Sequence, residues 1–193
     1  MRRTRSSGQV SSAVSDNIRP AYEEHGVTGF YEQFGSKYRN PHESILQSLL
    51  KRVALEWQLE LSSVLDLACG SGEVTLVLQE LGAKVSGIDP YTFKAYLERT
   101  SLQAEQFSFD DISNGILEGR NYSLIVCSFA LHLVEISRLP ILMFQLAQVS
   151  DTLLILTPHK RPQIKPEWGW KLVTEVLEDR VRARLYRTSG DTA

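Results

Sequence analysis

A glycine-rich segment between two apolar stretches has the residue types of a ligand-binding turn. Gly70, Ser71 and Gly72 follow the apolar run 64–68 and precede an apolar-periodic stretch. Glycine lets the backbone approach a ligand closely, and the free N–H groups at the start of a helix attract polar ligand atoms. The dinucleotide pattern G-x-G-x-x-G would require a third glycine where Thr75 stands. The turn therefore predicts a nucleotide-like ligand that does not place a pyrophosphate there.

Two acidic residues lie in the consecutive strand-like runs that come before and after this turn. Asp66 lies in the run 64–68, where it would repel a pyrophosphate, and Asp89 ends the run 84–89. Asp89 follows Gly72 by 17 positions. That is close to the spacing of ~20 residues at which an acid hydrogen-bonds a ribose. We therefore expect both carboxylates to contact the ligand, with helix capping or a surface position as the alternative.

The segments around these residues alternate between two periodicities. Short runs of β-branched and apolar residues indicate strands at 64–68, 84–89, 106–112, 123–129 and 152–158. Apolar residues at helical spacing occupy stretches between them, at 73–81, 91–101 and 138–149. Strands that alternate with helices predict an α/β fold, a doubly wound and mostly parallel sheet between helical layers.

The two ends of the chain differ from this alternating region. Residues 1–17 lack apolar periodicity, which predicts a flexible tail. Residues 18–60 contain an aromatic stretch and an amphipathic helix, and we expect them to form an N-terminal helical cap on a domain that spans 61–193. Residues 168–177 fit either a helix or one arm of a hairpin with 181–187. The hairpin is favoured, with 181–187 as a strand that exposes one face to water.

The segment VLDLACGSGEVT resembles the first motif of the class I S-adenosylmethionine-dependent methyltransferases, with Ala68 where that family more often has glycine. GIDPY looks like the second motif of the family, SFDDIS like the third and SLIVCSFALHLVE like the fourth. The stretch YEQFGSKYRNPHE is similar to one in small bacterial members. The resemblance covers about residues 45–160. It implies a Rossmann-like methyltransferase fold, S-adenosyl-L-methionine as cofactor, and methyl transfer by in-line displacement.

The resemblance also implies roles for individual residues. The implied cofactor-binding residues are Asp66, Ala68, Gly70, Gly72, Asp89, Pro90, Asp110, Asp111, Ile112 and Ser128. Among them, Asp89 would bind the ribose hydroxyls and Asp110 the exocyclic amine of adenine, with Ile112 beside the ring. Ser128 lies in the fourth motif, which in the family faces the methyl group and the acceptor.

Two histidines follow predicted strands and are candidates for a catalytic base. His132 follows the fourth strand and His159 the fifth, and for each a structural role is the alternative. The other two histidines have no companions at metal-ligand spacing, so no metal site is expected. Cys69 and Cys127 are the only cysteines, which favours small buried side chains and a reducing compartment, the cytoplasm.

Charge and composition limit the classes of partner. The net charge is −2, with +3 in each of the segments 1–20 and 158–193 and therefore −8 between them, which suits a cationic ligand. No apolar run approaches the ~20 residues that span a bilayer, so no membrane partner is expected. We expect a small-molecule acceptor. The alternatives are an RNA acceptor bound by the basic C-terminal strand, and a catalytically silent regulatory protein that binds S-adenosylmethionine. CSFALH differs from the Asn/Asp-Pro-Pro-aromatic signature of base-amine methylation, and the oligomeric state stays open.

Overall fold

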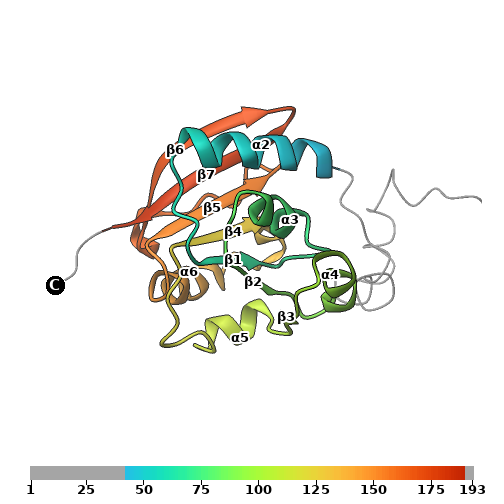
Figure 1. Ribbon diagram of the computed structural model, residues 1–193. Helices are drawn as coiled ribbons and strands as arrows, with labels where there is room; N and C mark the ends of the chain where they lie inside the picture. The colour runs from blue at the N-terminus through green and yellow to red at the C-terminus, as the bar shows by residue number, and fades with distance from the viewer. Residues whose placement is uncertain (1–41, 190–193) are drawn as a thin grey trace, which may run out of the picture.

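The computed structural model describes residues 42–189, in which a seven-stranded sheet carries helices on both faces (Figure 1). The strands are β1 (Val64–Leu67), β2 (Val85–Ile88), β3 (Ala104–Glu105), β4 (Leu124–Ser128), β5 (Thr152–Thr157), β6 (Trp170–Glu178) and β7 (Val181–Thr188). The helices are α2 (Glu43–Glu56), α3 (Glu73–Glu80), α4 (Phe93–Thr100), α5 (Phe109–Ser113) and α6 (Leu139–Ala147), with short 3-10 turns η2 (Leu131–Leu133) and η3 (Pro166–Trp168). The strand order is β3-β2-β1-β4-β5-β7-β6. β7 runs antiparallel to both of its neighbours, and the other adjacent strands are parallel. The predicted doubly wound α/β fold is confirmed.

Alternating side chains of the central strands supply two separate cores. In β1, Leu65 and Leu67 pack with residues of α5 and α6, whereas Val64 packs with residues of α2 and α3. Figure 1 shows α2 and α3 on one side of the sheet and α5 and α6 on the other. Because helices cover both faces, β4 and β5 are apolar along nearly their whole length.

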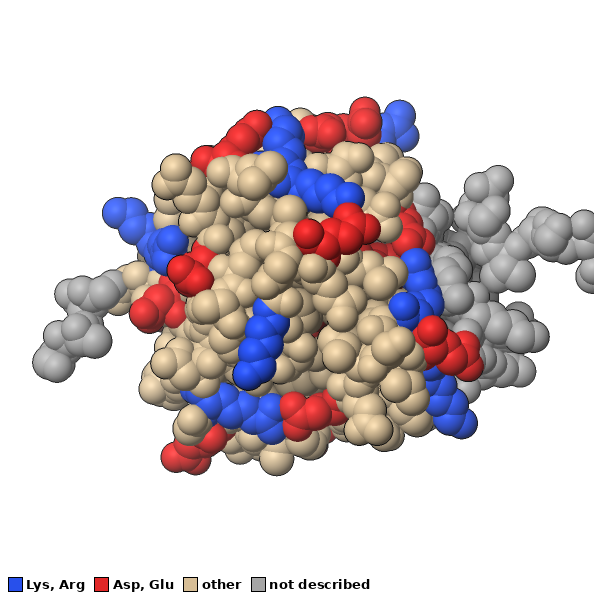
Figure 2. Space-filling view, viewed as in Figure 1, with Lys and Arg blue, Asp and Glu red and all other residues tan. Residues whose placement is uncertain are grey.

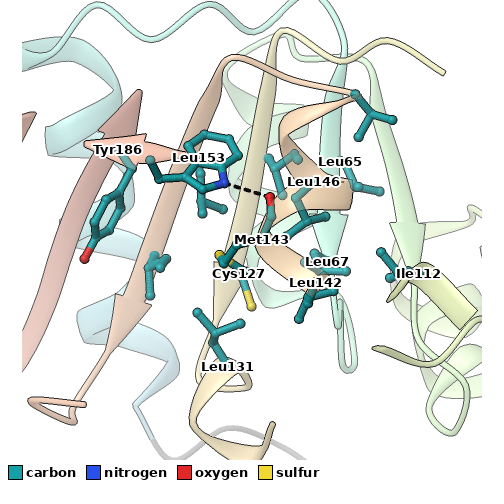
Figure 3. Packing of buried hydrophobic residues seen from close by; sticks show 14 of the residues in the cluster. Leu65, Leu67, Ile112, Cys127, Leu131, Leu142, Met143, Leu146, Leu153 and Tyr186 are labelled. Carbon is teal, nitrogen blue, oxygen red and sulfur yellow. Dashed lines mark hydrogen bonds between the residues drawn. The ribbon is translucent and has the colours of Figure 1, made fainter. Parts of the chain in front are cut away.

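The indole of Trp170 joins the C-terminal hairpin to α6. The ring is fully buried, and its Nε1 donates a 2.9 Å hydrogen bond to the carbonyl oxygen of Met143 (Figure 3). Leu153 and Tyr186 belong to the same cluster. A buried indole with its N–H satisfied provides apolar burial without the desolvation penalty of an unpaired donor. The hairpin favoured over 168–187 is therefore confirmed, as β6 and β7.

Side chains on both faces of β7 are buried over most of its length, so the expectation that one of its faces meets water is wrong. Its neighbours are β5 and β6, and the edge strand is β6. Arg184 of β7 is only 3% exposed and forms an ion pair with Glu175 of β6. The alternation of apolar and basic residues therefore reflects a buried, paired guanidinium, because the loop after β5 contacts Arg184 on the face that the pattern assigned to solvent.

The third predicted strand, 106–112, is also wrong over its whole length. β3 ends at Glu105, and the motif residues fold into α5. A capping box starts this helix: Ser108 Oγ accepts from the backbone N–H of Asp111 (3.1 Å), and Asp111 Oδ2 accepts from the backbone N–H of Ser108 (2.8 Å). Reciprocal bonds of this kind satisfy two free donors at a helix start, which favours helix over strand.

The predicted flexible tail and the aromatic stretch of the predicted cap lie outside the described residues. The described part of that cap is α2, which packs against α3 and β7 and contributes Leu49 and Leu50 to the core of the sheet. Glu43 at the start of α2 pairs with Arg99 of α4 at 2.5 Å. This helix thus shares its core with the domain predicted over 61–193. Over the described part of the chain, no helix combines the length and the apolar character needed to cross a membrane.

Candidate active site

A cavity of about 550 Å³ opens at the carboxyl ends of β1, β2 and β4. Its wall includes Ala68 and Gly70 after β1, Asp89 and Pro90 after β2, and Ser128 at the end of β4. In doubly wound sheets this edge is where ligands bind, because the loops after adjacent strands diverge there. These five residues were all predicted to bind the cofactor, and the structure brings them together.

The turn after β1 needs glycine for two different reasons. Gly70 has a φ of +57° and lines the cavity. Gly72 has a φ of +91° and does not line it. A Cβ on Gly72 would lie 2.4 Å from Cγ2 of Thr100, so this glycine allows α3 and α4 to pack closely. Gly72 is therefore a packing residue, and its expected contact with the ligand is not supported.

Asp89 holds this turn in place from the neighbouring strand. Its Oδ2 accepts from the N–H of Gly70 at 3.2 Å, and its Oδ1 accepts from the N–H groups of Tyr91 and Thr92 at 2.8 and 2.9 Å. The Thr92 hydroxyl in turn donates to the carbonyl oxygen of Gly70 at 2.6 Å. The carboxylate still lines the cavity, and Oδ2, which accepts a single backbone hydrogen bond, has a further lone pair for a ligand hydroxyl.

Asp66 lies beneath the turn and outside the cavity wall, which corrects the expectation that it contacts the ligand. Successive residues of a strand point to opposite faces, so Asp66 faces α3 while Leu65 and Leu67 face α6. Its Oδ2 accepts from the Thr75 hydroxyl at 2.7 Å, and its Oδ1 has no partner within residues 42–189. Burial, opposed by the Thr75 hydrogen bond, raises the pKa of Asp66 to about 7.

The residues of the third motif divide between the cavity and the helix cap. Asp110 and Ile112, both expected to contact the adenine, line the cavity. Asp111 does not, because its side chain caps α5, and its bonds to Ser108 lower the pKa of its carboxyl. Asp110 is exposed and accepts a 2.9 Å hydrogen bond from Arg138 at the start of α6.

The charges of the cavity wall fit a cation. Among residues 42–189, the side chains that line it include four carboxyl groups, a single guanidinium and no lysine. The charged lining residues are Glu73, Asp89, Asp110, Glu135 and Arg138. Apolar rings from Phe107 and Phe109 stand beside this acidic wall. An adenosyl sulfonium needs carboxylates for its hydroxyls, an apolar slot for its base and no phosphate-binding lysine, so the residues present fit S-adenosylmethionine.

His132 and His159 lie together in a neighbouring cavity. Their ring centres are 4.2 Å apart, and both line a second cavity of about 640 Å³. Neither lines the first cavity, although Val134 lines both. Desolvation, with a smaller contribution from His159, lowers the pKa of His132 to about 4. His132 is therefore neutral at pH 7 and able to accept a proton.

The two cysteines are free and buried in the structure. Burial raises the pKa of the Cys127 thiol to about 12, and it raises the pKa of Cys69 further. Both side chains are consequently thiols at neutral pH, and they pack as small apolar groups. Among residues 42–189, no group of three or more His, Cys, Asp or Glu side chains has the arrangement of a metal site.

Several lining residues were not predicted from the sequence. Phe107 and Phe109 fell in a run interpreted as strand, Glu135 ends the fourth motif, and Arg138 is the first residue of the predicted helix 138–149. The position of Arg138 at the start of a predicted helix is the one available signal, because the loop after β4 borders the cavity in this fold. For the other three, no pattern in the sequence distinguishes a cavity wall from an ordinary surface.

Comparison with known proteins identifies the family to which this chain belongs. A family model described as a methyltransferase domain matches residues 38–182. The Schizosaccharomyces pombe protein C17A5.05c, whose own activity is uncharacterised, is 33% identical in an alignment that covers 75% of this chain and 76% of that protein.

Solved methyltransferases share the fold. Magnesium protoporphyrin IX methyltransferase (ChlM) from Synechocystis PCC 6803, solved with bound S-adenosylmethionine, superposes with a TM-score of 0.61 at 18% identity, covering 93% of this chain and 100% of that one. The N-methyltransferase NodS from Bradyrhizobium japonicum WM9 gives a TM-score of 0.61 at 14% identity, covering 90% of this chain and 100% of that one. The chain therefore belongs to the class I S-adenosylmethionine-dependent methyltransferases and uses S-adenosylmethionine as its cofactor.

Proposed function

We propose that this enzyme methylates a small molecule that binds beside His132 and His159. The observation that carries the proposal is the second cavity, which adjoins the cofactor cavity at Val134. Its volume of about 640 Å³ falls within the range of small-molecule sites, roughly 300–1,000 Å³. A methyl acceptor must lie next to the cofactor, and the histidines stand on the wall where such an acceptor would bind.

The residues that would hold the cofactor are those brought together at the first cavity. Asp89 would accept a hydrogen bond from a ribose hydroxyl through Oδ2, and Asp110 and Ile112 would contact the adenine. The backbone of Ala68 and Gly70 would receive the amino-acid end. Pro90 would close the wall beside the ribose, and Ser128 would lie at the end that opens toward the acceptor. These roles follow from the lining of the cavity and from the order of the four motifs.

When bound, S-adenosylmethionine supplies an electrophilic methyl group on a sulfonium, which leaves as a neutral thioether after transfer. The protein contributes alignment of the acceptor and exclusion of water. His132 would accept the proton that the acceptor's nucleophilic atom loses, because its lowered pKa keeps the imidazole neutral. His159, at 4.2 Å between ring centres, would hold that ring in place.

The experiment that tests this function is label transfer. The protein is incubated with S-adenosylmethionine labelled in the methyl group and with separated small-molecule, RNA and protein fractions of a cell extract. Label is expected in the small-molecule fraction. Uptake by RNA or by protein would contradict the proposed acceptor, and no uptake from any fraction would support the regulatory alternative.

The basic C-terminal strand gives little support to an RNA acceptor. Arg184 is buried and paired, and Arg182 lies 3.7 Å from the same Glu175. On the face shown in Figure 2, Lys and Arg side chains are interspersed with Asp and Glu. RNA-binding surfaces need unpaired cations along the phosphate backbone, so these observations favour the small molecule.

A further inference from the structure

The second cavity carries a concentration of positive charge that the methyltransferase assignment does not explain. The loop after β5 contributes Lys160, Arg161 and Lys165 to its wall, together with the two histidines. No Asp or Glu lines it among residues 42–189. The neighbouring cofactor cavity has the opposite balance, with four carboxyl side chains and one guanidinium. Charge is therefore separated between two adjacent cavities.

The cations of this wall are available to a ligand. Within the described residues, no carboxylate lies within 4.0 Å of Lys160 or Arg161. Lys165 has Glu167 at 3.8 Å, but both side chains are well exposed, and ion pairs of that kind contribute at most about 1 kcal/mol. An anion that enters the cavity would thus meet cations without displacing a strong partner.

Apart from Gln163, the rest of the cavity wall is apolar and suited to a flat molecule. Ile136, Leu139 and Trp168 line it, and Ile136 is 72% exposed. Lys165 Nζ lies over the Trp168 ring, 5.6 Å from its centre, so a cation and an aromatic face are in contact. An aromatic ring that carries an anionic group would cover the apolar side chains and bring its charge to the cations.

The loop after β5, residues 158–165 and called the basic loop here, is held in position by hydrogen bonds and by packing against the core. The buried guanidinium of Arg184 donates to the carbonyl oxygens of Lys160 and Pro162 at 3.2 and 3.4 Å. Ile164 of the same loop is buried in the core, and the N–H of His159 donates to the Thr157 hydroxyl at 3.1 Å. A loop fixed at several points loses less conformational entropy when a ligand binds.

We infer that the second cavity binds an aromatic acceptor bearing a carboxylate or phosphate group, recognised by Lys160, Arg161 and Lys165. The inference rests on the proposed function, since it names the chemical class of that function's acceptor. The anionic group binds the loop after β5, the ring packs on Trp168 and Ile136, and the nucleophilic atom is directed toward the histidines and the cofactor cavity.

The test measures binding rather than turnover. The full chain is titrated with 6-hydroxy-2-naphthoate and, separately, with the neutral 6-hydroxy-2-naphthamide, each followed by the fluorescence of the naphthyl ring. Both titrations are run with and without saturating S-adenosylhomocysteine. We expect the anion to bind at least about tenfold more tightly than the amide, because its carboxylate would meet three cations at once and the neutral amide would not.

Variants locate the binding. The double variant Arg161→Gln/Lys165→Gln is expected to lose that preference for the anion while binding the amide as before. Lys171→Gln is the matched control, because Lys171 is an exposed lysine on β6 outside both cavities. Circular dichroism and the affinity for S-adenosylhomocysteine should be unchanged in every variant, since these side chains lie outside the first cavity.

Equal affinity for anion and amide would overturn the inference, as would an equal loss of affinity in the Lys171→Gln control. A failure of the proposed function looks different. In that case labelled methyl groups enter no small molecule, or S-adenosylhomocysteine fails to bind by calorimetry, whatever the naphthoate does. Label found in a neutral or cationic small molecule would leave the proposed function intact and reject the anionic acceptor.

Discussion

The carboxylate of Asp89 accepts backbone hydrogen bonds from Gly70, Tyr91 and Thr92 and still faces the cofactor cavity. Asp89→Asn removes the charge while it keeps the shape of the side chain. We expect the affinity for S-adenosylhomocysteine to fall by about 10- to 100-fold, because a charge-assisted hydrogen bond to a ribose hydroxyl contributes roughly 1.5–3 kcal/mol. Isothermal titration calorimetry measures this loss.

Asp111→Asn is the control for that substitution. Asp111 lies in the sequence between Asp110 and Ile112, which line the cavity, but its own side chain caps α5 and does not line the cavity. Its affinity for S-adenosylhomocysteine should match that of the wild type. An equal loss in both variants would mean that the acidic character of the region, rather than the position of Asp89, determines binding.

Asp66 gives folding stability a pH dependence of its own. Burial raises its pKa from 3.8 to about 7, so the folded protein holds this proton more tightly than the unfolded chain does. The contribution of Asp66 to stability is therefore greatest below pH 4, falls as the pH rises to 7, and is constant above it. Asp66→Asn removes this titration. The free energy of unfolding of the variant relative to wild type should rise by about 2 kcal/mol between pH 5 and pH 8.

Urea unfolding at several pH values, followed by circular dichroism, checks this prediction. His132 acts in the opposite direction, because its lowered pKa makes stability fall as the pH drops below 6.5. Comparing the variant with the wild type at each pH cancels that contribution. A difference that does not change between pH 5 and pH 8 would show that Asp66 is already ionised in the folded protein at pH 5.

His132 should affect turnover without affecting the cofactor. His132→Gln is expected to lower kcat on the acceptor identified by label transfer by roughly 10²- to 10⁴-fold, the usual contribution of a general base. Because His132 lies outside the first cavity, the affinity for S-adenosylhomocysteine should stay the same. In the wild type, kcat/KM should begin to fall only as the pH approaches 4. A fall centred near pH 6.5 would contradict the role of His132 as the base.

At the scale of elements, periodicity in the sequence predicted well those segments whose surroundings are uniform. β4 and β5 are buried on both faces, and their continuous apolar runs indicate as much. The segment 106–112 has strand-like composition but folds as α5, because a local Ser108–Asp111 capping box competes with the sheet. The strand of Asp66 was identified correctly, but which face that residue occupies depends on the helices packed on each side.

The basic loop depends on one buried side chain of β7. Arg184→Met keeps much of the volume of the side chain but removes the ion pair with Glu175 and two hydrogen bonds to loop carbonyls. We expect the free energy of unfolding to fall by about 3 kcal/mol, the usual cost of breaking a buried pair. The affinity for 6-hydroxy-2-naphthoate should fall with it, whereas S-adenosylhomocysteine should bind as before.

Arg187→Met is the matched control on the same strand. Arg187 is exposed and loses only one hydrogen bond, to the Thr152 hydroxyl, so this substitution should change stability by about 1 kcal/mol. Its affinity for naphthoate should equal that of the wild type. Retention of full naphthoate affinity in a folded Arg184→Met protein would show that the loop keeps its conformation without the guanidinium.

At the scale of the whole molecule, the sheet places an acid-rich and a base-rich cavity side by side at its carboxyl edge. The acidic cavity suits a cationic cofactor, and the basic cavity suits an anionic acceptor. Their ligands should therefore attract each other before transfer, and the attraction should disappear once the sulfonium has become a neutral thioether. This arrangement of charges would favour binding of the acceptor to the cofactor-loaded enzyme and release of the methylated product after the reaction.

The coupling can be measured with ligands that do not react. Sinefungin carries a protonated amine in place of the methylated sulfonium, whereas S-adenosylhomocysteine is neutral at that position. Two unit charges about 10 Å apart at an effective dielectric constant of about 40 attract by about 0.8 kcal/mol, so 2-naphthoate should bind roughly fourfold more tightly with sinefungin than with S-adenosylhomocysteine. The neutral 2-naphthamide should show no such difference, and 0.5 M NaCl should reduce the preference. Equal affinities for the anion in both complexes at low salt would mean that the two cavities act independently.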